Sequence, residues 1–383
     1  MIEELLSPLA SHICDTKNYH PQQWGALIEK NEGVLPERNE VKAAIIGIAE
    51  GRGAANNSDT KHAPALIRQE LYKLYADAPM KVIDLGDLQP GASLQDTNSA
   101  VAMIVHDLLQ DNIVPILLGG SQALTLGQFK AYERMEKFVN IAVVDSHINF
   151  NEEAELSSEN YLAHIINHQP NYLFNFSHLA HQTYLTQPDL LTAMKELSFE
   201  CQRLGEVQND IKEVEPTLRN SDMLSFDMKA VRMSDAPAHI DGSPHGLYGE
   251  QACTIARYAG ISNQLSSFGL FELNPAYDNN RQSTKLAAHI VWHFLQGLAK
   301  RKNEHPEQHP KNFLKYMVTL QANEYEIIFW KSKTNGRWWM ELPIFDNKKY
   351  LEKRFLPCSE NDYLIACRDE IPPRWLNGIH RMD

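Results

Sequence analysis

The sequence predicts an α/β protein: a three-layer α/β/α sandwich on a mainly parallel sheet, followed by a small α+β appendage. Three observations predict it. Short, continuous apolar runs recur along the first 300 residues, which is typical of strands buried on both faces of a sheet. Segments with helical spacing alternate with these runs, which favours right-handed crossovers between parallel strands. Beyond residue 300 the pattern changes to shorter, more aromatic strands.

The strands and helices of the first part alternate along the chain. We expect strands at 42–48, 81–87, 113–120, 139–147, 172–178, 222–228 and 264–274. We expect helices at 63–76, 99–111, 188–198, 206–215, 249–260 and 284–300. In a sheet of this kind ligands bind beyond the carboxyl ends of the strands, so the residues that follow each strand are the candidates for a site.

A polar, proline-containing segment, 300–312, separates two parts of the chain. We expect an arrangement of an α/β domain over residues 1–302 and a β-rich appendage over 313–383. The appendage has predicted strands at 315–320, 325–332 and 338–344. The last two form a hairpin around Asn335-Gly336, a dipeptide favoured in tight turns.

Composition and charge exclude several classes of protein. Lys and Arg total 36 and Asp and Glu total 49, which gives a formal net charge of −13. Nucleic-acid and anionic-membrane binders need a basic face, so we expect no nucleic-acid partner and no membrane. The first residues lack the basic start and apolar run of a signal peptide, and five scattered cysteines fit reduced thiols. We therefore expect a cytoplasmic protein.

Polar residues gather at four of the predicted strand ends. They stand in the segments Gly119-Gly120-Ser121-Gln122, Asp145-Ser146-His147-Ile148-Asn149, Ser225-Phe226-Asp227-Met228-Lys229 and Glu272-Leu273-Asn274-Pro275. Side chains alternate along an extended chain, so Asp227 and Lys229 point to the same side. A metal site would need a carboxylate at both positions, and the second is a lysine.

In order and spacing, these segments resemble the ureohydrolase superfamily of arginase, agmatinase and formimidoylglutamase. The family segments read Gly-Gly-Asp-His, Asp-Ala-His-x-Asp, Ser-x-Asp-x-Asp and Glu-x-Asn-Pro. Further similar segments are Ala63-Pro64 to Arg68, Asp84-Leu85-Gly86-Asp87, Asp235-Ala236-Pro237 and Gly246-Leu247 to Glu250. The resemblance covers about residues 40–300, and over 157–185 it is nearest to the formimidoylglutamase-like branch. It implies an arginase-like fold and gives the appendage no counterpart.

The resemblance also implies a set of site residues. The family binds two manganese ions through a His, then Asp, His and Asp, then two further Asp, and the paired ions activate a bridging hydroxide. Three of these positions are retained, as Asp145, His147 and Asp227. The other three are changed: the first His position is Gln122, the last of the central group is Asn149, and the last Asp is Lys229.

These changes alter the charge of the site. Four carboxylates become two and an ammonium is added, so the formal charge changes from −4 to −1. At an effective dielectric constant of ~20, an ammonium ~4 Å from a divalent cation is repelled by roughly 8 kcal/mol. Amides are poor ligands for a transition metal. We therefore expect no dimanganese centre and no cofactor, with Lys229 paired to Asp227 or Asp145. Binding of a single, weakly held ion by Asp145, His147 and Asp227 remains an alternative.

Glu272 matches the family glutamate that binds the guanidinium or amidine end of the substrate. A carboxylate can bind such a group through two hydrogen bonds without a metal. The resemblance thus implies a ligand site with Glu272, Gln122 and Asn149, and with Arg52 of the preceding loop as an anion contact. The alternative for Glu272 is a structural role, in which it caps backbone amides or pairs with Lys229.

Two functions remain open. The leading expectation is an oligomeric pseudoenzyme: a non-hydrolytic binding or scaffold protein that recognises a guanidino or amidino ligand and contacts itself or a protein partner through the appendage. The alternative is an active C–N hydrolase on a linear amidine or guanidine, of the formimidoylglutamase or agmatinase kind. It would use manganese, with Asp145, His147, Asp227 and Lys229 as its catalytic groups.

Overall fold

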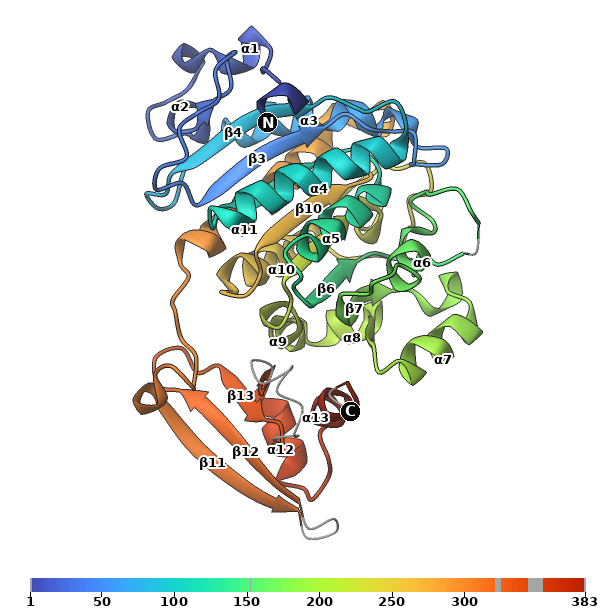
Figure 1. Cartoon of the computed structure of the whole chain (residues 1–383), viewed down its shortest axis with the longest axis vertical. Helices are drawn as coiled ribbons and strands as arrows, with labels where there is room; N and C mark the ends of the chain where they lie inside the picture. Colours follow the sequence, from blue (N-terminus) through green and yellow to red (C-terminus); the bar gives the residue numbers. More distant parts are fainter. Residues whose placement is uncertain (1, 152, 321–324, 344–353, 382–383) are drawn as a thin grey trace.

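A computed structural model describes residues 2–151, 153–320, 325–343 and 354–381. Within these residues, a ten-stranded sheet forms the larger part of the molecule and a four-stranded antiparallel sheet forms the C-terminal part (Figure 1). This confirms the predicted fold class. The limits predicted for the two domains, 1–302 and 313–383, stay predictions.

The large sheet is parallel except at one edge. Its strands are β1 (Leu6–Ser7), β2 (Glu29–Lys30), β3 (Ala43–Ile48), β4 (Val82–Leu88), β5 (Val114–Leu118), β6 (Val139–Val144), β7 (Leu173–His181), β8 (Glu200–Arg203), β9 (Met223–Asp227) and β10 (Ser267–Phe271). They lie in the order β1-β4-β3-β5-β10-β9-β6-β7-β8, and β2 also pairs with β4. Only β1 runs antiparallel to its neighbour in this described sheet. The order places β5, β10, β9 and β6 side by side.

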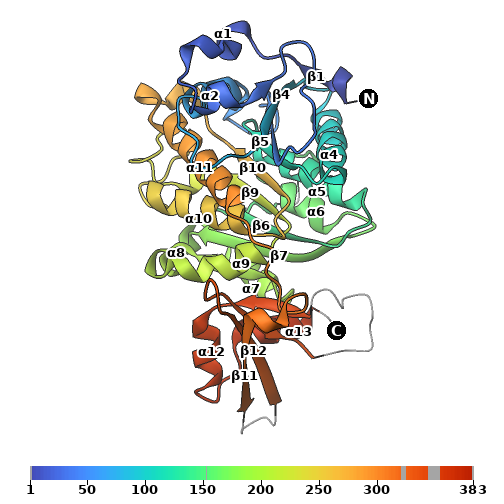
Figure 2. The ribbon, with the colours of Figure 1, turned by 90° about the vertical axis from the view of Figure 1, so that its left-hand side faces the viewer.

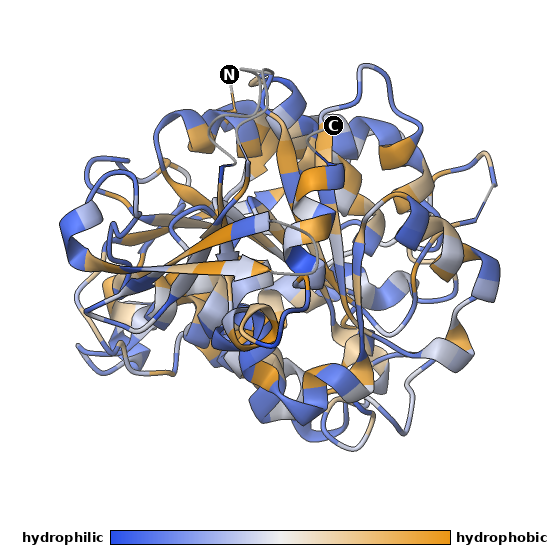
Figure 3. Ribbon diagram, turned by 90° about the horizontal axis from the view of Figure 1, so that it is seen from below, coloured by the Kyte–Doolittle hydropathy of each residue, from blue (hydrophilic) through white to orange (hydrophobic). Residues whose placement is uncertain are grey.

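Helices cover both faces of this sheet. They are α1 (Ser11–Cys14), α2 (Trp24–Leu27), α3 (Ala63–Leu71), α4 (Leu94–Gln110), α5 (Thr125–Glu133), α6 (Tyr161–Ile166), α7 (Pro188–Glu196), α8 (Leu204–Asn209), α9 (Val214–Arg219), α10 (Gly249–Ile261) and α11 (Gln282–Ala299). Strand β3 shows why three layers form. Ala43 and Ile45 pack in one core with α3, α10 and α11, whereas Ala44 and Ile46 pack in another with α4. Hydrophobic positions accordingly follow the strands and alternate with hydrophilic ones along the helices (Figure 3).

Some elements differ from those expected. Helix α5 and edge strand β8 were not predicted, and β10 is shorter than the predicted 264–274. The single helix expected over 206–215 is two helices, α8 and α9. The Asp210 side chain accepts a hydrogen bond from the backbone N–H of Lys212 at 3.0 Å, and this starts a new turn that interrupts the helix.

The C-terminal part has its own core. Its elements are β11 (Phe313–Leu320), β12 (Tyr325–Ser332), β13 (Trp338–Glu341), β14 (Phe355–Cys358), α12 (Glu360–Ala366) and α13 (Pro373–His380). Phe329, Trp338, Met340 and Trp375 meet in its interior. The predicted hairpin between β12 and β13 is confirmed, and Gly336 adopts a φ of +75° in its turn.

The appendage lies below the large domain in Figure 2. Two arginines, one from each part, attach it to the large domain. Arg219 of α9 donates to the backbone carbonyls of Trp338 at 3.0 Å and Cys358 at 3.2 Å. Arg374 of α13 lies 3.5 Å from the Glu200 carboxylate, on β8. These charge-assisted contacts cross the boundary between the two sheets.

In the part of the chain that the structure describes, none of the helices has the length and apolar character needed to cross a membrane.

Candidate functional site

The four strand ends singled out by the sequence meet at one edge of the sheet. Strands β5, β10, β9 and β6 are adjacent and parallel, so their carboxyl ends lie together. The residues after them form one cluster, which we call the strand-end cluster: Gln122, Asp145, Asn149, Asp227 and Lys229. Gln122, Asp145 and Asp227 have no solvent exposure, so every charge and polar group here depends on its protein partners.

The end of β5 shows how the sequence positions Gln122. Gly119 and Gly120 adopt φ values of +77° and +79°, which glycine reaches without strain. A Cβ at Gly120 would lie 2.8 Å from the backbone carbonyls of Glu50 and Ile48, so a larger residue does not fit. Ser121 then accepts a hydrogen bond from the N–H of Ala123 and starts a short 3-10 turn, which carries Gln122 into the cluster.

Lys229 forms ion pairs with both carboxylates of the cluster. Its Nζ lies 3.6 Å from Asp145 Oδ1 and 3.6 Å from Asp227 Oδ2. The other oxygen of Asp227 accepts the backbone N–H of Lys229 at 2.6 Å, which fixes the turn after β9. The lysine side chain is only 12% exposed, so the ammonium is held between the two carboxylates rather than in solvent.

The two amides bind the same carboxylates. Asn149 Nδ2 donates to Asp145 Oδ2 at 2.6 Å. The amide of Gln122 lies 3.0 Å from Asp145 Oδ2 and 3.2 Å from Asp227 Oδ2, and the orientation that satisfies both oxygens turns its nitrogen toward them. The carboxylate oxygens therefore accept hydrogen bonds from amide N–H groups and form ion pairs with the ammonium.

The protonation of the cluster follows from these contacts. Burial opposes the charged form of Lys229, but Asp145 and Asp227 outweigh it and raise the lysine pKa above its ordinary value. Burial likewise opposes ionisation of Asp145, yet Lys229 and the neighbouring histidines lower the pKa of Asp145. Burial and the charge of Asp145 raise the pKa of Asp227 well above its usual value. The cluster thus carries little net charge.

Two histidines lie beside the cluster. His147 was predicted, and its Nδ1 lies 2.8 Å from Ser146 Oγ. Burial and the Lys229 ammonium lower the pKa of His147. His178, on β7, was not predicted: its Nε2 donates to the carbonyl of His147 at 2.8 Å, and burial lowers its pKa to about 4. Both rings are therefore neutral at pH 7.

Glu272 stands next to the cluster, where β10 ends. Its backbone has a φ of +63°, which is strained for a residue with a side chain. One carboxylate oxygen accepts from the N–H of Gln122 at 2.8 Å and the other from Asn57 Nδ2 at 2.8 Å. His239 Nε2 lies 3.9 Å from the latter oxygen. Asn57 and His239 were not identified from the sequence, although Asn57 lies in the same loop as Arg52.

Arg52 lies in a different set of contacts from the one expected. Its guanidinium binds the carboxylate of Glu50, with Nε 2.9 Å from Oε1. It also donates to the carbonyls of Gly91 and Ala92, each at 2.8 Å. The hydrogen bonds of Arg52 thus fasten its loop to the start of α4, and its role as an anion contact stays a prediction.

The donor set of the cluster differs from the one that the resemblance implies for two manganese ions. Among the described residues, no group of three or more His, Cys, Asp or Glu side chains is placed to hold a metal ion. The weak single-ion set of Asp145, His147 and Asp227 stays a prediction. Lys229 brings a cation to the carboxylates, and Gln122 and Asn149 add N–H donors where a metal needs lone pairs.

Comparison with known proteins agrees with this arrangement of strands. The formimidoylglutamase of Staphylococcus haemolyticus is 23% identical over 288 residues, which cover 70% of this chain and 90% of the relative. That of Staphylococcus aureus strain MSSA476 is 26% identical over 270 residues, or 66% of this chain and 85% of the relative.

Solved structures show the same fold. Trypanosoma cruzi formiminoglutamase, crystallised with Mn²⁺, superposes with a TM-score of 0.66 at 19% identity over 73% of this chain and 99% of its own. Formimidoylglutamase from Bacillus subtilis gives a TM-score of 0.65 at 18% identity, over 77% of this chain and 95% of its own. The sequence model of the arginase family matches residues 41–296, more than half of the chain. The chain therefore belongs to the arginase family.

Proposed function

We propose that this arginase-family protein is a non-hydrolytic binding or scaffold protein whose strand-end cluster uses Lys229 as an internal cation in place of metal ions. One observation carries the proposal: the lysine ammonium lies 3.6 Å from both Asp145 and Asp227, the carboxylates that the resemblance assigns to metal binding. A tethered ammonium neutralises these buried carboxylates without a bound metal ion, and it repels a divalent ion.

Glu272 supports a retained ligand-binding role. It is buried, its backbone is strained, and strained conformations persist where the surroundings enforce them, commonly at ligand sites. Its two oxygens already accept hydrogen bonds from Gln122 and Asn57, but a carboxylate has further lone pairs for a guanidino or amidino group. Calorimetric titration with agmatine should show binding that Glu272→Gln abolishes. Equal binding by both proteins would remove Glu272 from the proposal.

Metal analysis tests the central claim. Protein prepared with manganese and then freed of unbound ions should retain well under one ion per chain. The combined variant Gln122→His, Asn149→Asp and Lys229→Asp should bind manganese more tightly, because it restores three metal-binding side chains and removes the ammonium. Two ions bound by the wild-type protein would overturn the proposal. A triple variant without increased affinity would refute the assignment of these positions.

The alternative is an active C–N hydrolase, which the similarity to formimidoylglutamases favours. Release of urea or formamide from arginine, agmatine or formiminoglutamate separates the two functions. We expect none above background, since Lys229 is held as an ammonium and provides no base. Turnover at ordinary enzyme rates would establish the alternative. Cytoplasmic location, oligomerisation and contact with a protein through the appendage remain part of the proposal.

A further inference from the structure

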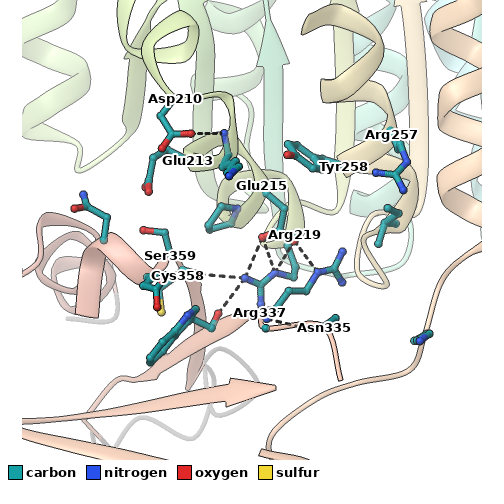
Figure 4. Close-up of a pocket in the computed structure, with 18 of the residues that line it drawn as sticks. Asp210, Glu213, Glu215, Arg219, Arg257, Tyr258, Asn335, Arg337, Cys358 and Ser359 are labelled. Atoms are coloured by element: carbon teal, nitrogen blue, oxygen red, sulfur yellow. Dashed lines mark hydrogen bonds and ion pairs between the residues drawn. The ribbon is translucent and has the colours of Figure 1, made fainter. Parts of the chain in front are cut away.

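A second site lies where the appendage meets the large domain. A cavity of about 730 Å³, which we call the junction cavity, opens between α9, α10 and the appendage (Figure 4). Its volume is within the range of small-molecule sites. It shares no residue with the strand-end cluster, and none of the residues carried over from the family lines it.

The junction cavity is basic although the chain is acidic. Six basic side chains line it, against four acidic ones, in a chain of net charge −13. The basic side chains are Lys212, Arg219, Arg257, Lys300, Lys302 and Arg337, and the acidic ones are Asp210, Glu213, Glu215 and Glu360. A local surplus of positive charge against the charge of the whole molecule is the electrostatic feature of an anion site.

Two of the four acidic side chains, Glu215 and Glu360, form ion pairs with basic side chains. Glu215 is shared by two arginines, with Arg219 Nε and Arg337 Nε each 3.0 Å from its Oε1. Glu360 pairs with Lys331, outside the cavity. One carboxylate between two guanidinium groups leaves a positive charge uncompensated at the centre of the cavity wall (Figure 4).

Three of the basic side chains have no such partner. Among the described residues, no carboxylate lies within ion-pair distance of Lys212, Arg257 or Lys302. Lys212 and Lys302 are exposed and Arg257 is partly buried, so each can reach into the cavity or solvent at little cost.

Arg219 supplies an independent observation. Its side chain is only 6% exposed, and its Nη1 is buried without a hydrogen-bond partner among the described residues. Its other nitrogens bind Glu215 and the carbonyls of Trp338 and Cys358. The guanidinium also stacks on Trp339, with 4.1 Å from Cζ to the ring centroid. A buried guanidinium N–H without an acceptor is costly, so Arg219 keeps unused hydrogen-bonding capacity at the boundary where the cavity lies.

We propose that the junction cavity binds a small organic anion with phosphate or carboxylate groups. Guanidinium groups bind both chemistries through paired, charge-assisted hydrogen bonds. The anion would contact residues of the large domain, such as Arg257, and residues of the appendage, such as Arg337. Its binding therefore stabilises the docked arrangement of the two parts.

Titration of the full-length protein tests this proposal. Inorganic phosphate, pyrophosphate and citrate are added in metal-free buffer at constant ionic strength set with KCl. Tryptophan fluorescence is the readout, since Trp338 lines the cavity and Trp339 stacks on Arg219. At least one probe should give a saturable change and raise the melting temperature. Preference for pyrophosphate assigns phosphate chemistry, and preference for citrate assigns carboxylate chemistry.

Charge-matched variants locate the site. Arg257→Gln combined with Lys302→Gln should weaken binding about tenfold or more, because each loses a charge-assisted contact. Lys212→Gln, at an exposed position, tests the same wall with little risk to folding. Lys195→Gln on α7 removes one charge, as Lys212→Gln does, but outside the cavity, and should leave affinity unchanged. No saturable binding of any probe, or equal weakening by Lys195→Gln, overturns the proposal without bearing on the metal content of the strand-end cluster.

Discussion

Lys229 places one positive charge between two carboxylates that have no contact with solvent. In the buried cluster the attraction between these groups offsets the loss of their hydration only while all three are present. Gln122 and Asn149 complete the arrangement, because both amides bind Asp145 Oδ2, whereas the ammonium faces Asp145 Oδ1. Three residues from distant positions in the sequence therefore act on the same two carboxylates, as the proposed function requires.

Replacing Lys229 should show that the cation is required. Lys229→Ala leaves two buried carboxylates without a counter-charge and should destabilise the protein by about 3–5 kcal/mol. Chemical denaturation in metal-free buffer without a chelator measures this change. Added Mn²⁺ should recover part of the lost stability in the variant and none in the wild type, since a divalent ion can then approach the carboxylates.

A surface pair provides the control for this variant. Lys81 Nζ lies 3.3 Å from Glu29 Oε1, and the two side chains are 31% and 53% exposed. Lys81→Ala should therefore cost less than about 1 kcal/mol and show no response to Mn²⁺. If Lys229→Ala behaves like Lys81→Ala, the ammonium is not an essential part of the cluster.

At the scale of elements, the turn after β5 determines where two site residues lie. The carbonyl of Gly120 accepts the backbone N–H of Glu272 at 3.0 Å, and the chain then turns through Ser121 to Gln122. This hydrogen bond links the end of β5 to the end of β10. The positive φ of Gly120 and the close carbonyls of Glu50 and Ile48 make glycine necessary there.

A single methyl group at Gly120 should therefore disturb the site. Gly120→Ala combines an unfavourable φ with a contact of 2.8 Å to two backbone oxygens, so it should cost roughly 2–4 kcal/mol. Gly205→Ala in α8 is the matched control, since a Cβ there meets nothing within 4 Å, and it should be neutral or stabilising by up to about 1 kcal/mol. Urea denaturation compares the two. Equal stability of both variants would show that the turn tolerates a side chain.

The central strands β3, β5, β6, β9 and β10 were predictable because each is a mainly apolar run buried on both faces, whereas the polar edge strand β8 was not. Helix α5 was not, because buried polar residues interrupt its apolar pattern. Thr125 and Gln128 are fully buried and face serines of the sheet, with 2.7 Å between Thr125 Oγ1 and Ser225 Oγ and 2.7 Å between Gln128 Nε2 and Ser267 Oγ. Sequence periodicity alone predicts that such polar positions are exposed. Here their hydrogen bonds allow them to lie in the core.

At the scale of the whole molecule, the proximity of Asp145, Asp227 and Lys229 followed from sheet order and from the family resemblance. The contacts of Glu272 with Asn57 and His239 did not, because they depend on loops that no periodic pattern describes. The junction cavity could not be predicted either. It exists only because the appendage, which has no counterpart in the family pattern, docks against α9 and α10.

This docking should weaken in acid through Glu200. Burial opposes ionisation of Glu200, but Arg374 and local hydrogen bonds outweigh it and lower the carboxyl pKa below its ordinary value. A group with a lowered pKa in the folded state stabilises that state at neutral pH and loses the contribution as pH falls below about 4.5. Hydrogen exchange of β13 and β14 should therefore accelerate in the wild type between pH 5 and lower values, after correction for intrinsic rates. Glu200→Gln should lose most of this pH dependence, whereas Glu196→Gln, at an exposed position of α7, should keep it.

Arg374→Ala should loosen the appendage at every pH, by about 3–5 kcal/mol, because it removes the buried partner of Glu200 and Asp362. Hydrogen exchange in β13 and β14 is compared between the wild type and the three variants. If it is the same in all of them, the contacts of Arg374 do not hold the appendage in place.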